Sequence, residues 1–341
     1  MILVISHASF EFTTEIVMDW LFYLKANFIR INGNDLVENS LHRINIEIGN
    51  EHHPAEQPLI TYNGRQLNLA DINAIWYRRW SFHATFPKIS PLEEKKFEED
   101  INEFRTEEFK IISEIFFSQI KNKKIIGSPN HLKKNPSKYQ QLLAAKKAGI
   151  DIPDTIITSS REELYNFYLS HHKRIIVKAM SEAGLFNFSG ELLAGFTEIV
   201  SEEVINNLPD HFYPSSFQEM VEKDVELRVY YLEGKCYPMA IFSTLDKQTS
   251  IDFRKYNIQT PNRNVPFKIP DDLAARIVVL MNDLGLNTGS LDIILTTDGK
   301  FVFLEVNHGG QFGMVSEPCN YQLEKIVATS LIESDLIPLK N

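Results

Sequence analysis

Short apolar segments alternate with a helical pattern along the first third of the chain. Ile2–Ile5 and Ala74–Tyr77 are continuous apolar runs, and Phe28–Ile31 ends at a turn cluster, so all three are predicted to be strands. Residues 16–24 carry apolar side chains at helical spacing, and Thr13-Thr14-Glu15 can cap that helix. Strands that alternate with helices predict a parallel or mixed α/β sheet.

The longest helical pattern covers residues 91–121. Phe97 and Ile101 begin an apolar stripe at roughly helical spacing, and acids and lysines lie between its members. We interpret these charges as a solvated face of the helix. Upstream of it, Asn63-Gly64 follows the apolar run Leu59–Tyr62, which predicts a β-hairpin.

The rest of the chain predicts two further units. Residues 125–215 contain a strand at Ile125-Ile126, a helix from Pro136 to Ala148, a second helix at 160–170 and a strand at Arg174–Lys178. Beyond residue 216 the predicted strands are Phe217–Val221, Glu226–Leu232, Tyr237–Phe242, Ser290–Thr296 and Phe301–Val306, and the predicted helices are Asp271–Leu284 and Glu317–Glu333. We therefore predict an N-terminal α/β domain at 1–124, a central unit at 125–215 and a C-terminal unit at 216–341.

Composition narrows the class of protein. The 341 residues fit two or three domains at about 150 residues each. With 35 Lys and Arg against 45 Asp and Glu, the net charge is −10, which argues against non-specific binding to nucleic acid or an anionic membrane. Cys236 and Cys319 show no CxxC spacing, so neither a disulfide framework nor a zinc site is expected, and free cysteines fit a reducing cytoplasm. No apolar run approaches about 18 residues, so no membrane span is predicted.

The C-terminal hairpin brings oxygen donors together. The strands Ser290–Thr296 and Phe301–Val306 are joined through Asp298-Gly299, so Asp292 can lie beside the far end of the partner strand. Glu305 and Asn307 are two residues apart and point to one face. Two carboxylates and an amide oxygen suit Mg²⁺, while a strand-end acid in a salt bridge is the alternative.

Two lysines occupy positions suited to phosphate. Lys178 ends the apolar strand Ile175–Val177 and is followed by a loop of small residues, a place where an ammonium can neutralise phosphate oxygens. Lys138 is a second candidate at the start of the first helix of the central unit. No GxxxxGK[ST] motif occurs, and each lysine taken alone is also compatible with an ordinary surface charge.

A strand near residue 220 suits a nucleotide. An extended segment such as Gln218–Val221 can offer backbone groups to an adenine edge, and an acid a few residues on, such as Glu226, can bond ribose hydroxyls. Arg228 alternates with apolar neighbours, so it could bind phosphate or pair with an acid. Arg254 offers a second guanidinium, which would stabilise charge at a phosphoryl centre.

Taken in order, these segments resemble the ATP-grasp superfamily over residues 125–341, and the N-terminal α/β unit corresponds to its pre-grasp domain. The resemblance implies a combined α/β and α+β architecture with ATP held between two α+β units. Similarity to the peptide-maturing branch, which includes the microviridin-type ligases that make graspetides, lies in residues 75–79, 125–129, 149–155, 303–307 and 310–312. Residues 1–6, 252–256 and 311–316 are most similar to its grasp-with-spasm maturases.

The resemblance implies a role for each candidate residue. Lys138 and Lys178 would bind the phosphates of ATP. The backbone of Glu219 and Val221 would bind adenine, and Glu226 would face the ribose. Arg228 and Arg254 would be catalytic, near the γ-phosphate, and Mg²⁺ would be held by Asp292, Glu305 and Asn307. Two departures from the usual pattern are Asn135-Pro136-Ser137 before the first lysine and His308-Gly309, where a proline is common.

The expected activity is ATP-dependent activation of Asp or Glu side chains in a ribosomal precursor peptide, followed by ester or amide crosslinking. A leader segment of that peptide could dock at 190–216, where Glu198, Glu202, Glu203 and Asp210 gather; an ordinary surface helix is the alternative. The resemblance also implies a homodimer and allows a SPASM-type partner. The alternatives are an amino-acid ligase that acts on a protein tail or small acid, and a leader-binding module without turnover.

Overall fold

The computed structural model describes residues 1–7, 11–33, 43–45, 59–62, 65–78, 95–120, 122–127, 136–180, 185–188, 191–194, 197–243 and 262–336. The chain divides into two compact units. The first unit comprises 1–135, 308–316 and 322–341, and the second comprises 136–307 and 317–321. Each unit is described by itself below.

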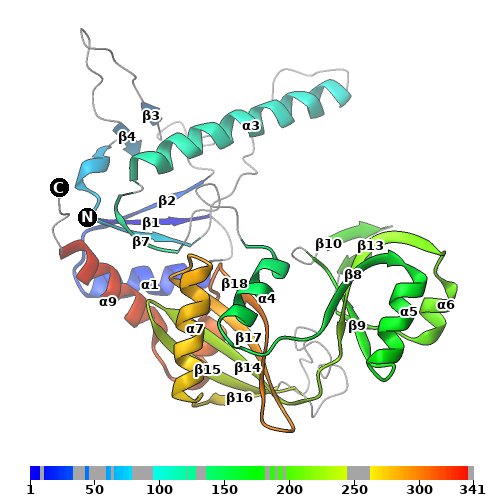
Figure 1. The fold of residues 1–341 in the computed structure, drawn as a ribbon. Helices are drawn as coiled ribbons and strands as arrows, with labels where there is room; N and C mark the ends of the chain where they lie inside the picture. Colours follow the sequence, from blue (N-terminus) through cyan, green and yellow to red (C-terminus); the bar gives the residue numbers. More distant parts are fainter. Residues whose placement is uncertain are drawn as a thin grey trace. The chain divides into compact units, whose positions relative to one another are not determined.

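A parallel four-stranded sheet forms the centre of the first unit (Figure 1). Its order is β2-β1-β6-β7, and every neighbouring pair is parallel, as the alternation of strands and helices predicts. Strand β1, which has a neighbour on each side, is buried along its whole length, as its five apolar or small residues allow. The elements are β1 (Ile2–Ser6), α1 (Phe12–Tyr23), β2 (Phe28–Asn32), β6 (Ala74–Tyr77) and β7 (Lys124–Ile126).

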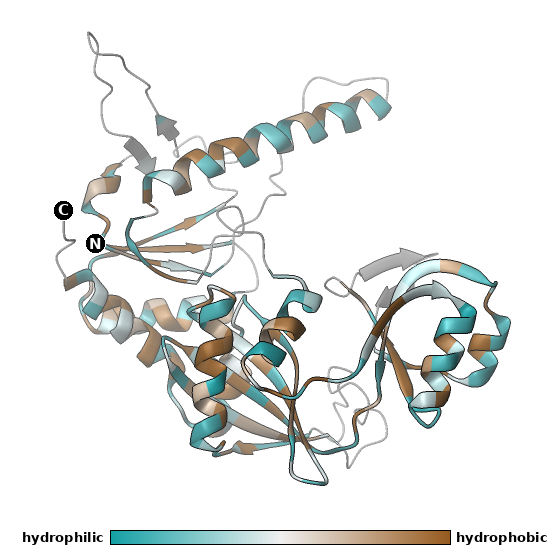
Figure 2. Cartoon of the chain, in the orientation of Figure 1, coloured by the Kyte–Doolittle hydropathy of each residue, from teal (hydrophilic) through white to brown (hydrophobic). Residues whose placement is uncertain are grey.

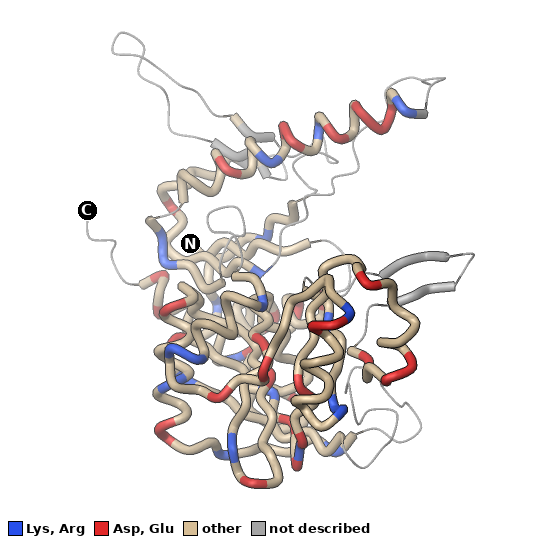
Figure 3. Tube along the Cα trace, turned by 45° about the vertical axis from the view of Figure 1, so that its right-hand side comes forward, with Lys and Arg blue, Asp and Glu red and all other residues tan. Residues whose placement is uncertain are grey.

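Two further helices complete the first unit. The long helix α3 (Lys95–Ile120) buries Phe109, Phe116, Phe117 and Ile120 in the core of the sheet. Apolar and polar residues alternate along α3 in Figure 2, and Figure 3 shows its acidic residues interspersed with Lys and Arg, which confirms the predicted amphipathic helix. The C-terminal helix α9 (Leu323–Leu336) packs beside α1.

A small antiparallel sheet, β3-β4-β5, also belongs to the first unit. Its strands are β3 (Arg43–Asn45), β4 (Leu59–Tyr62) and β5 (Arg65–Asn68), followed by the 3₁₀ turn η1 (Leu69–Asp71). Tyr62 pairs with Arg65, so the predicted hairpin is confirmed, although its Asn63-Gly64 turn lies outside the described residues.

The second unit begins with an antiparallel sheet of order β12-β9-β13-β8. Two helices, α5 and α6, cover this sheet. They pack Leu164, Tyr168 and Ile205 against Ile175 and Phe217 of the sheet. A separate hairpin pairs β10 with β11. The elements are β8 (Thr155–Ser160), α5 (Arg161–Ser170), β9 (Ile175–Lys178), β10 (Leu185–Phe188), β11 (Glu191–Ala194), β12 (Glu198–Ile199), α6 (Glu202–Asn207) and β13 (His211–Glu219).

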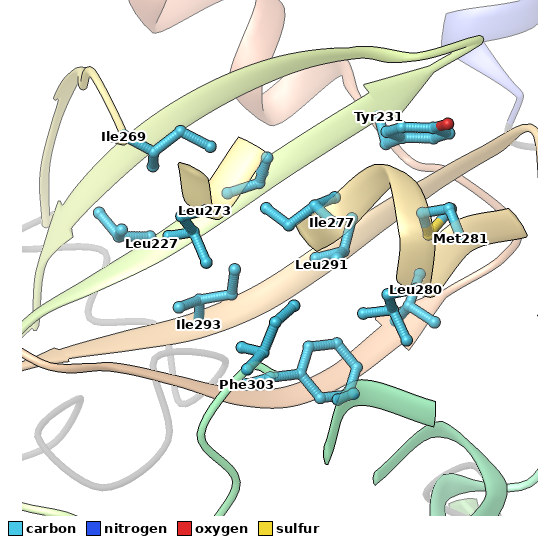
Figure 4. Close-up of a cluster of buried hydrophobic side chains, with 14 of the residues drawn as sticks. Leu227, Tyr231, Ile269, Leu273, Ile277, Leu280, Met281, Leu291, Ile293 and Phe303 are labelled. Atoms are coloured by element: carbon cyan, nitrogen blue, oxygen red, sulfur yellow. The ribbon is translucent and has the colours of Figure 1, made fainter. Parts of the chain in front are cut away.

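A five-stranded antiparallel sheet of order β16-β15-β14-β17-β18 carries the rest of the second unit. Helix α7 covers one face, where Leu273, Ile277 and Leu280 pack against Leu291 and Phe303 (Figure 4). The apolar cluster on this face joins α7 to strands β14, β17 and β18. The elements are α4 (Lys138–Lys147), β14 (Lys223–Leu232), β15 (Lys235–Phe242), β16 (Arg263–Pro266), α7 (Asp271–Asp283), β17 (Thr288–Thr296) and β18 (Phe301–Asn307).

The compact units differ from the predicted boundaries 1–124, 125–215 and 216–341. The strand at Ile125-Ile126 is present, but it pairs with β6 and therefore belongs to the first sheet. The boundary at 215/216 falls inside β13, which pairs with both β8 and β9. The chain also returns to the first unit after β18, because α9 packs on α1.

Two helix ends differ from the predictions. Helix α1 begins at Phe12 with Glu11 at the cap position, and no side chain caps it, so the cap predicted at Thr13-Thr14-Glu15 is wrong. The single helix predicted at Glu317–Glu333 is wrong as well. Two helices, α8 (Gly313–Cys319) and α9, are separated at Asn320 and Gln322, which have φ values of 51° and 52°.

Candidate functional site

Strand alternation in β14 separates a core face from a polar face. Leu227, Val229 and Tyr231 belong to the apolar cluster that contains α7. Since neighbouring side chains of a strand point to opposite faces, Glu226 and Arg228 lie on the face opposite α7. Both are buried, at 6% exposure each, so the sequence places two charged groups in the interior of the unit.

Arg228 is paired with a carboxylate of the neighbouring strand. Arg228 lies directly opposite Asp292 in the register of β14 and β17. Its Nη1 donates to both carboxylate oxygens of Asp292, at 2.6 and 2.7 Å. Burial raises the pKa of Asp292, while the adjacent Arg228 opposes that shift. Of the two possibilities that the sequence left open for Arg228, the structure has the pairing with an acid.

The second carboxylate joins this pair across the next strand. Asp292 is opposite Glu305, and Ser290 is opposite Asn307, so the predicted juxtaposition of Asp292 with the end of the partner strand is confirmed. The register shifts between Asp292 and its neighbour Ile293, which pairs with Phe303. Leu304 is therefore the extra residue of a β-bulge, a feature that re-aims side chains beside it.

Both candidate lysines meet the Glu305 carboxylate. The Nζ of Lys178 lies 3.0 Å from Oε2 of Glu305, and the Nζ of Lys138 lies 3.3 Å from the same oxygen. Lys138 also donates to the Ala179 carbonyl at 3.0 Å, next to the end of β9. The two lysines and Glu305 thus form one cluster, although they come from α4, β9 and β18.

Local sequence explains the position of Lys138. Ser137 and Gln140 form a reciprocal capping box, so α4 begins at Lys138 and the lysine occupies the first turn. Pro136 precedes the cap, where its missing N–H costs no helical hydrogen bond. The chain therefore starts this helix at a defined residue, and the looser motif around Pro136 does not displace the lysine from the cluster.

Gln141 is a residue of the site that sequence reasoning missed. Its Oε1 accepts the Val306 N–H at 2.8 Å, and its Nε2 donates to the Pro136 carbonyl at 3.0 Å. The side chain is buried and joins α4 to β18, the strand that carries Glu305. The sequence did contain a hint of this role, because Gln141 is the one polar residue on the buried face of α4, and a buried amide needs hydrogen-bond partners.

The proposed nucleotide-binding segment is partly occupied by bonds within the protein. The Glu219 N–H donates to the Asp154 carbonyl, and its Oε1 accepts the Asp154 N–H, each at 2.9 Å. The backbone of Val221 makes no hydrogen bond to another part of the described chain. Glu226 accepts from Lys223 at 2.9 Å and from Ser243 at 3.3 Å. The predicted contacts with adenine and ribose stay predictions.

The charges of the cluster suit a polyphosphate and a divalent cation. Three cations (Lys138, Lys178 and Arg228) surround two carboxylates (Asp292 and Glu305), so the local charge is 3 − 2 = +1. Oxygen donors on adjacent strands are the chemistry that Mg²⁺ prefers, and the residues present therefore fit the ion. Arg254 lies outside the described residues. Within the described ranges, three or more His, Cys, Asp or Glu side chains nowhere gather to hold a metal ion, and the role of Asn307 as a third donor stays a prediction.

One family model matches the N-terminal part of the chain. Residues 1–133 match the model of the MvdD pre-ATP-grasp domain. No curated protein sequence matches the chain. The end of the matched region lies within two residues of the boundary of the first unit at Asn135.

Solved structures extend the likeness to the whole chain. The macrocyclase MdnC from Microcystis aeruginosa MRC, bound with precursor peptide MdnA, is 21% identical, with a TM-score of 0.80 over 98% of this chain and 100% of that one. A RiPP-associated ATP-grasp ligase from Chryseobacterium gregarium, in complex with ADP and a leader and core peptide, is 23% identical, with a TM-score of 0.82 over 99% and 97%.

A third solved structure is less similar. D-alanyl-alanine synthetase A from Vibrio cholerae O1 biovar eltor str. N16961 is 12% identical, with a TM-score of 0.54 over 98% of both chains. This similarity shows a common fold and nothing more. The chain therefore has the ATP-grasp fold, and its residues 1–133 match the MvdD pre-ATP-grasp domain.

Proposed function

We propose that this protein is an ATP-dependent ligase that crosslinks side chains of a ribosomally made precursor peptide. The observation that carries the proposal is the cluster of Lys138, Lys178 and Glu305 beside the Arg228–Asp292 pair, on a chain whose full length has the ATP-grasp fold. The compared macrocyclase is bound with a precursor peptide, and the RiPP-associated ligase is in complex with a leader and core peptide. Both support a peptide as the substrate class.

The charge cluster supports a mechanism in which ATP replaces Glu305 as the partner of the two lysines. Lys138 and Lys178 both face Glu305. Phosphate oxygens of ATP would take over the two ammonium groups, and Glu305 would become available together with Asp292 and Asn307 to hold Mg²⁺. The ion, when bound, would neutralise charge on the transferring phosphoryl group. Arg228 would hold Asp292 in place throughout.

The proposed chemistry has two steps. A carboxylate oxygen of a peptide Asp or Glu attacks the γ-phosphorus of ATP; the bond to ADP breaks, and an acyl phosphate forms. A Ser or Thr hydroxyl or a Lys amine of the same peptide then attacks the acyl carbon; phosphate leaves, and the nucleophile loses its proton. Catalysis would rest on positioning and on cationic groups around the phosphate, here Lys138, Lys178 and the proposed Arg254.

The partners follow from the same proposal. A leader segment would dock around 190–216, where the β10–β11 hairpin and α6 lie in sequence. Glu202 and Asp210 already pair with Lys173 and Arg161, which leaves the exposed Glu203 as the better candidate among the acids of α6 and its flank. A homodimer, a SPASM-type partner and a cytoplasmic location remain part of the proposal. Across the described helices, none has the length and apolar character needed to cross a membrane.

The direct test is a mass spectrum of the candidate precursor peptide after incubation with the protein, ATP and Mg²⁺. We expect a loss of the mass of one water molecule for each ring formed. The Glu305→Gln variant should abolish that loss, whereas Glu222→Gln should retain it, because Glu222 pairs with the exposed Arg174 outside the cluster. Unchanged peptide mass with wild-type protein would contradict the proposal.

An amino-acid ligase is the second candidate, favoured by the shared fold with D-alanyl-alanine synthetase A. It would use the same nucleotide site and differ in the acceptor. ATP consumption that depends on free amino acids, with no change in peptide mass, would select it. A leader-binding module without turnover is disfavoured, because its binding role alone gives no reason for three cations around two buried or half-buried carboxylates.

A further inference from the structure

We infer that Arg78 is a positioning residue for the loop at residues 308–312, which directly follows Asn307 in the chain. The inference rests on the proposed function, because Asn307 is a proposed Mg²⁺ ligand. Arg78 follows β6 directly, and its backbone N–H continues the sheet by donating to the Ile5 carbonyl at 2.9 Å. The sheet therefore fixes where the Arg78 side chain begins.

A buried carboxylate orients the guanidinium. The Nε of Arg78 lies 3.5 Å from Oε2 of Glu11, and both side chains are 3% exposed. The same Oε2 accepts from Thr14 at 3.2 Å, and the other oxygen of Glu11 lies 3.5 Å from His7. Glu11 thus has the cap position of α1 but directs its carboxylate to Arg78 and its neighbours instead of to the helix N–H groups.

The other end of the guanidinium reaches the loop. Nη1 of Arg78 donates to the Gly309 carbonyl. Gly309 is two residues after Asn307, and its neighbour Gly310 has a φ of 54°, so the chain turns sharply here. Residues 308–316 belong to the first unit although they follow β18 without a break, and Phe312 is buried at 1% exposure. Arg78 is therefore a side-chain tether at the start of the return segment.

Arginine suits these two contacts. Its Nε forms an ion pair with Glu11 while its Nη1 donates a hydrogen bond to Gly309, whereas a lysine ammonium is a single point charge. A buried ion pair contributes little net stability compared with an apolar pair of the same size, so stability alone is a weak reason for the pair. Fixing the loop that follows Asn307 is the use that the contacts support.

The first experiment measures hydrogen exchange of the backbone at 308–312 in protein without nucleotide or metal. Arg78→Lys and Arg78→Gln should speed exchange in this loop by about tenfold, the loss expected when a charge-assisted hydrogen bond is removed. The control is Ile120→Ala, which removes buried apolar contact from a cluster of the same unit that contains no residue of the loop. Equal exchange in wild-type protein and in the Arg78→Lys variant would overturn the inference.

The second experiment separates this inference from the proposed function. Calorimetric titration of ADP at a series of Mg²⁺ concentrations should show that Asn307→Ala and Arg78→Lys both raise the Mg²⁺ concentration needed for tight binding, by about tenfold. The double variant should add little to either. If wild-type protein binds ADP without any dependence on Mg²⁺, the proposed function fails and the inference with it. If Asn307→Ala shifts the dependence but Arg78→Lys does not, the inference alone is wrong.

Discussion

The ammonium of Lys178 lies 3.0 Å from the carboxylate of Glu305, and these two residues come from separate sheets of the second unit. Lys178 ends β9, and Glu305 lies near the end of β18. The proposed phosphate-binding lysine is thus held by a proposed metal ligand. Any anion that displaces Glu305 from Lys178 also frees an oxygen donor for a cation, which couples the two proposed binding events.

Replacing Lys178 tests this coupling. Lys178→Met should lower turnover of ATP by at least about 100-fold, because it removes a cation that faces the transferring phosphate. Lys147→Met is the matched control, since Lys147 pairs with the exposed Asp283 and should leave turnover unchanged. Steady-state rates of ADP release measure both. Equal loss in the two variants would indicate a general charge effect.

The Arg228–Asp292 pair gives a prediction for stability. Arg228→Met should lower the free energy of unfolding by about 3–5 kcal/mol, because it leaves a buried carboxylate without its cation. Urea unfolding followed by fluorescence would measure the loss. The double variant with Asp292→Leu should recover most of it, whereas two independent and additive losses would contradict the pairing. Lys300→Gln, at an exposed pair with Asp298, is the control.

Gln141 should matter for β18 although it bears no charge. Gln141→Leu leaves the buried Val306 N–H without its acceptor, so we expect a loss of about 1–3 kcal/mol in the free energy of unfolding. Leu143→Gln, at an exposed position of the same helix, should change stability far less. Thermal unfolding of both variants decides the point, and a smaller loss for Gln141→Leu than for the control would be incompatible with the bond.

His171 predicts a small pH dependence of stability. Burial alone lowers its pKa, but hydrogen bonds with the Phe167 carbonyl and Asp154 outweigh burial and raise the pKa above 6.5. A raised pKa in the folded state means that the charged imidazole stabilises the protein fully below pH 6.5 and that this stability is lost as the pH rises through the folded pKa.

The test compares wild-type protein with His171→Asn across this range. The difference in unfolding free energy should be about 0.5 kcal/mol at low pH, because exposed ion pairs contribute little. It should shrink as the pH rises. His211→Gln, at an exposed histidine, is the control. A difference that grows with rising pH would have the wrong sign for this pair.

Local patterns gave most of the elements. Periodicity predicted helices α4, α5 and α7 and several strands, among them β1, β6, β9, β17 and β18. It could do so because the period of apolar residues depends only on the backbone geometry of a strand or helix. The pairing of Asp292 with Glu305 was also predictable, since an Asp-Gly turn sets the register of a hairpin. The extra residue Leu304 shows where that reasoning ends, because a bulge depends on packing.

Contacts between segments that are far apart in the chain could not be predicted from the sequence. Nothing local distinguishes whether the strand at Ile125-Ile126 belongs with the segment before or after it, and its pairing with β6 settles that. The break in the helix predicted at Glu317–Glu333 was signalled by Pro318 and Asn320, since asparagine tolerates a left-handed conformation, but the apolar periodicity outweighed these signals.

The sequence by itself determined the element types, the donor set and the resemblance, because residue chemistry and period are written along the chain. The tertiary structure decided which charges meet: Arg228 with Asp292, both lysines with Glu305, and Arg78 with Glu11. The physical reason is that each of these pairs joins residues many positions apart. Their distances are set by the pairing of strands that are not consecutive in the chain and by the packing of separate layers, and neither is encoded in any local pattern.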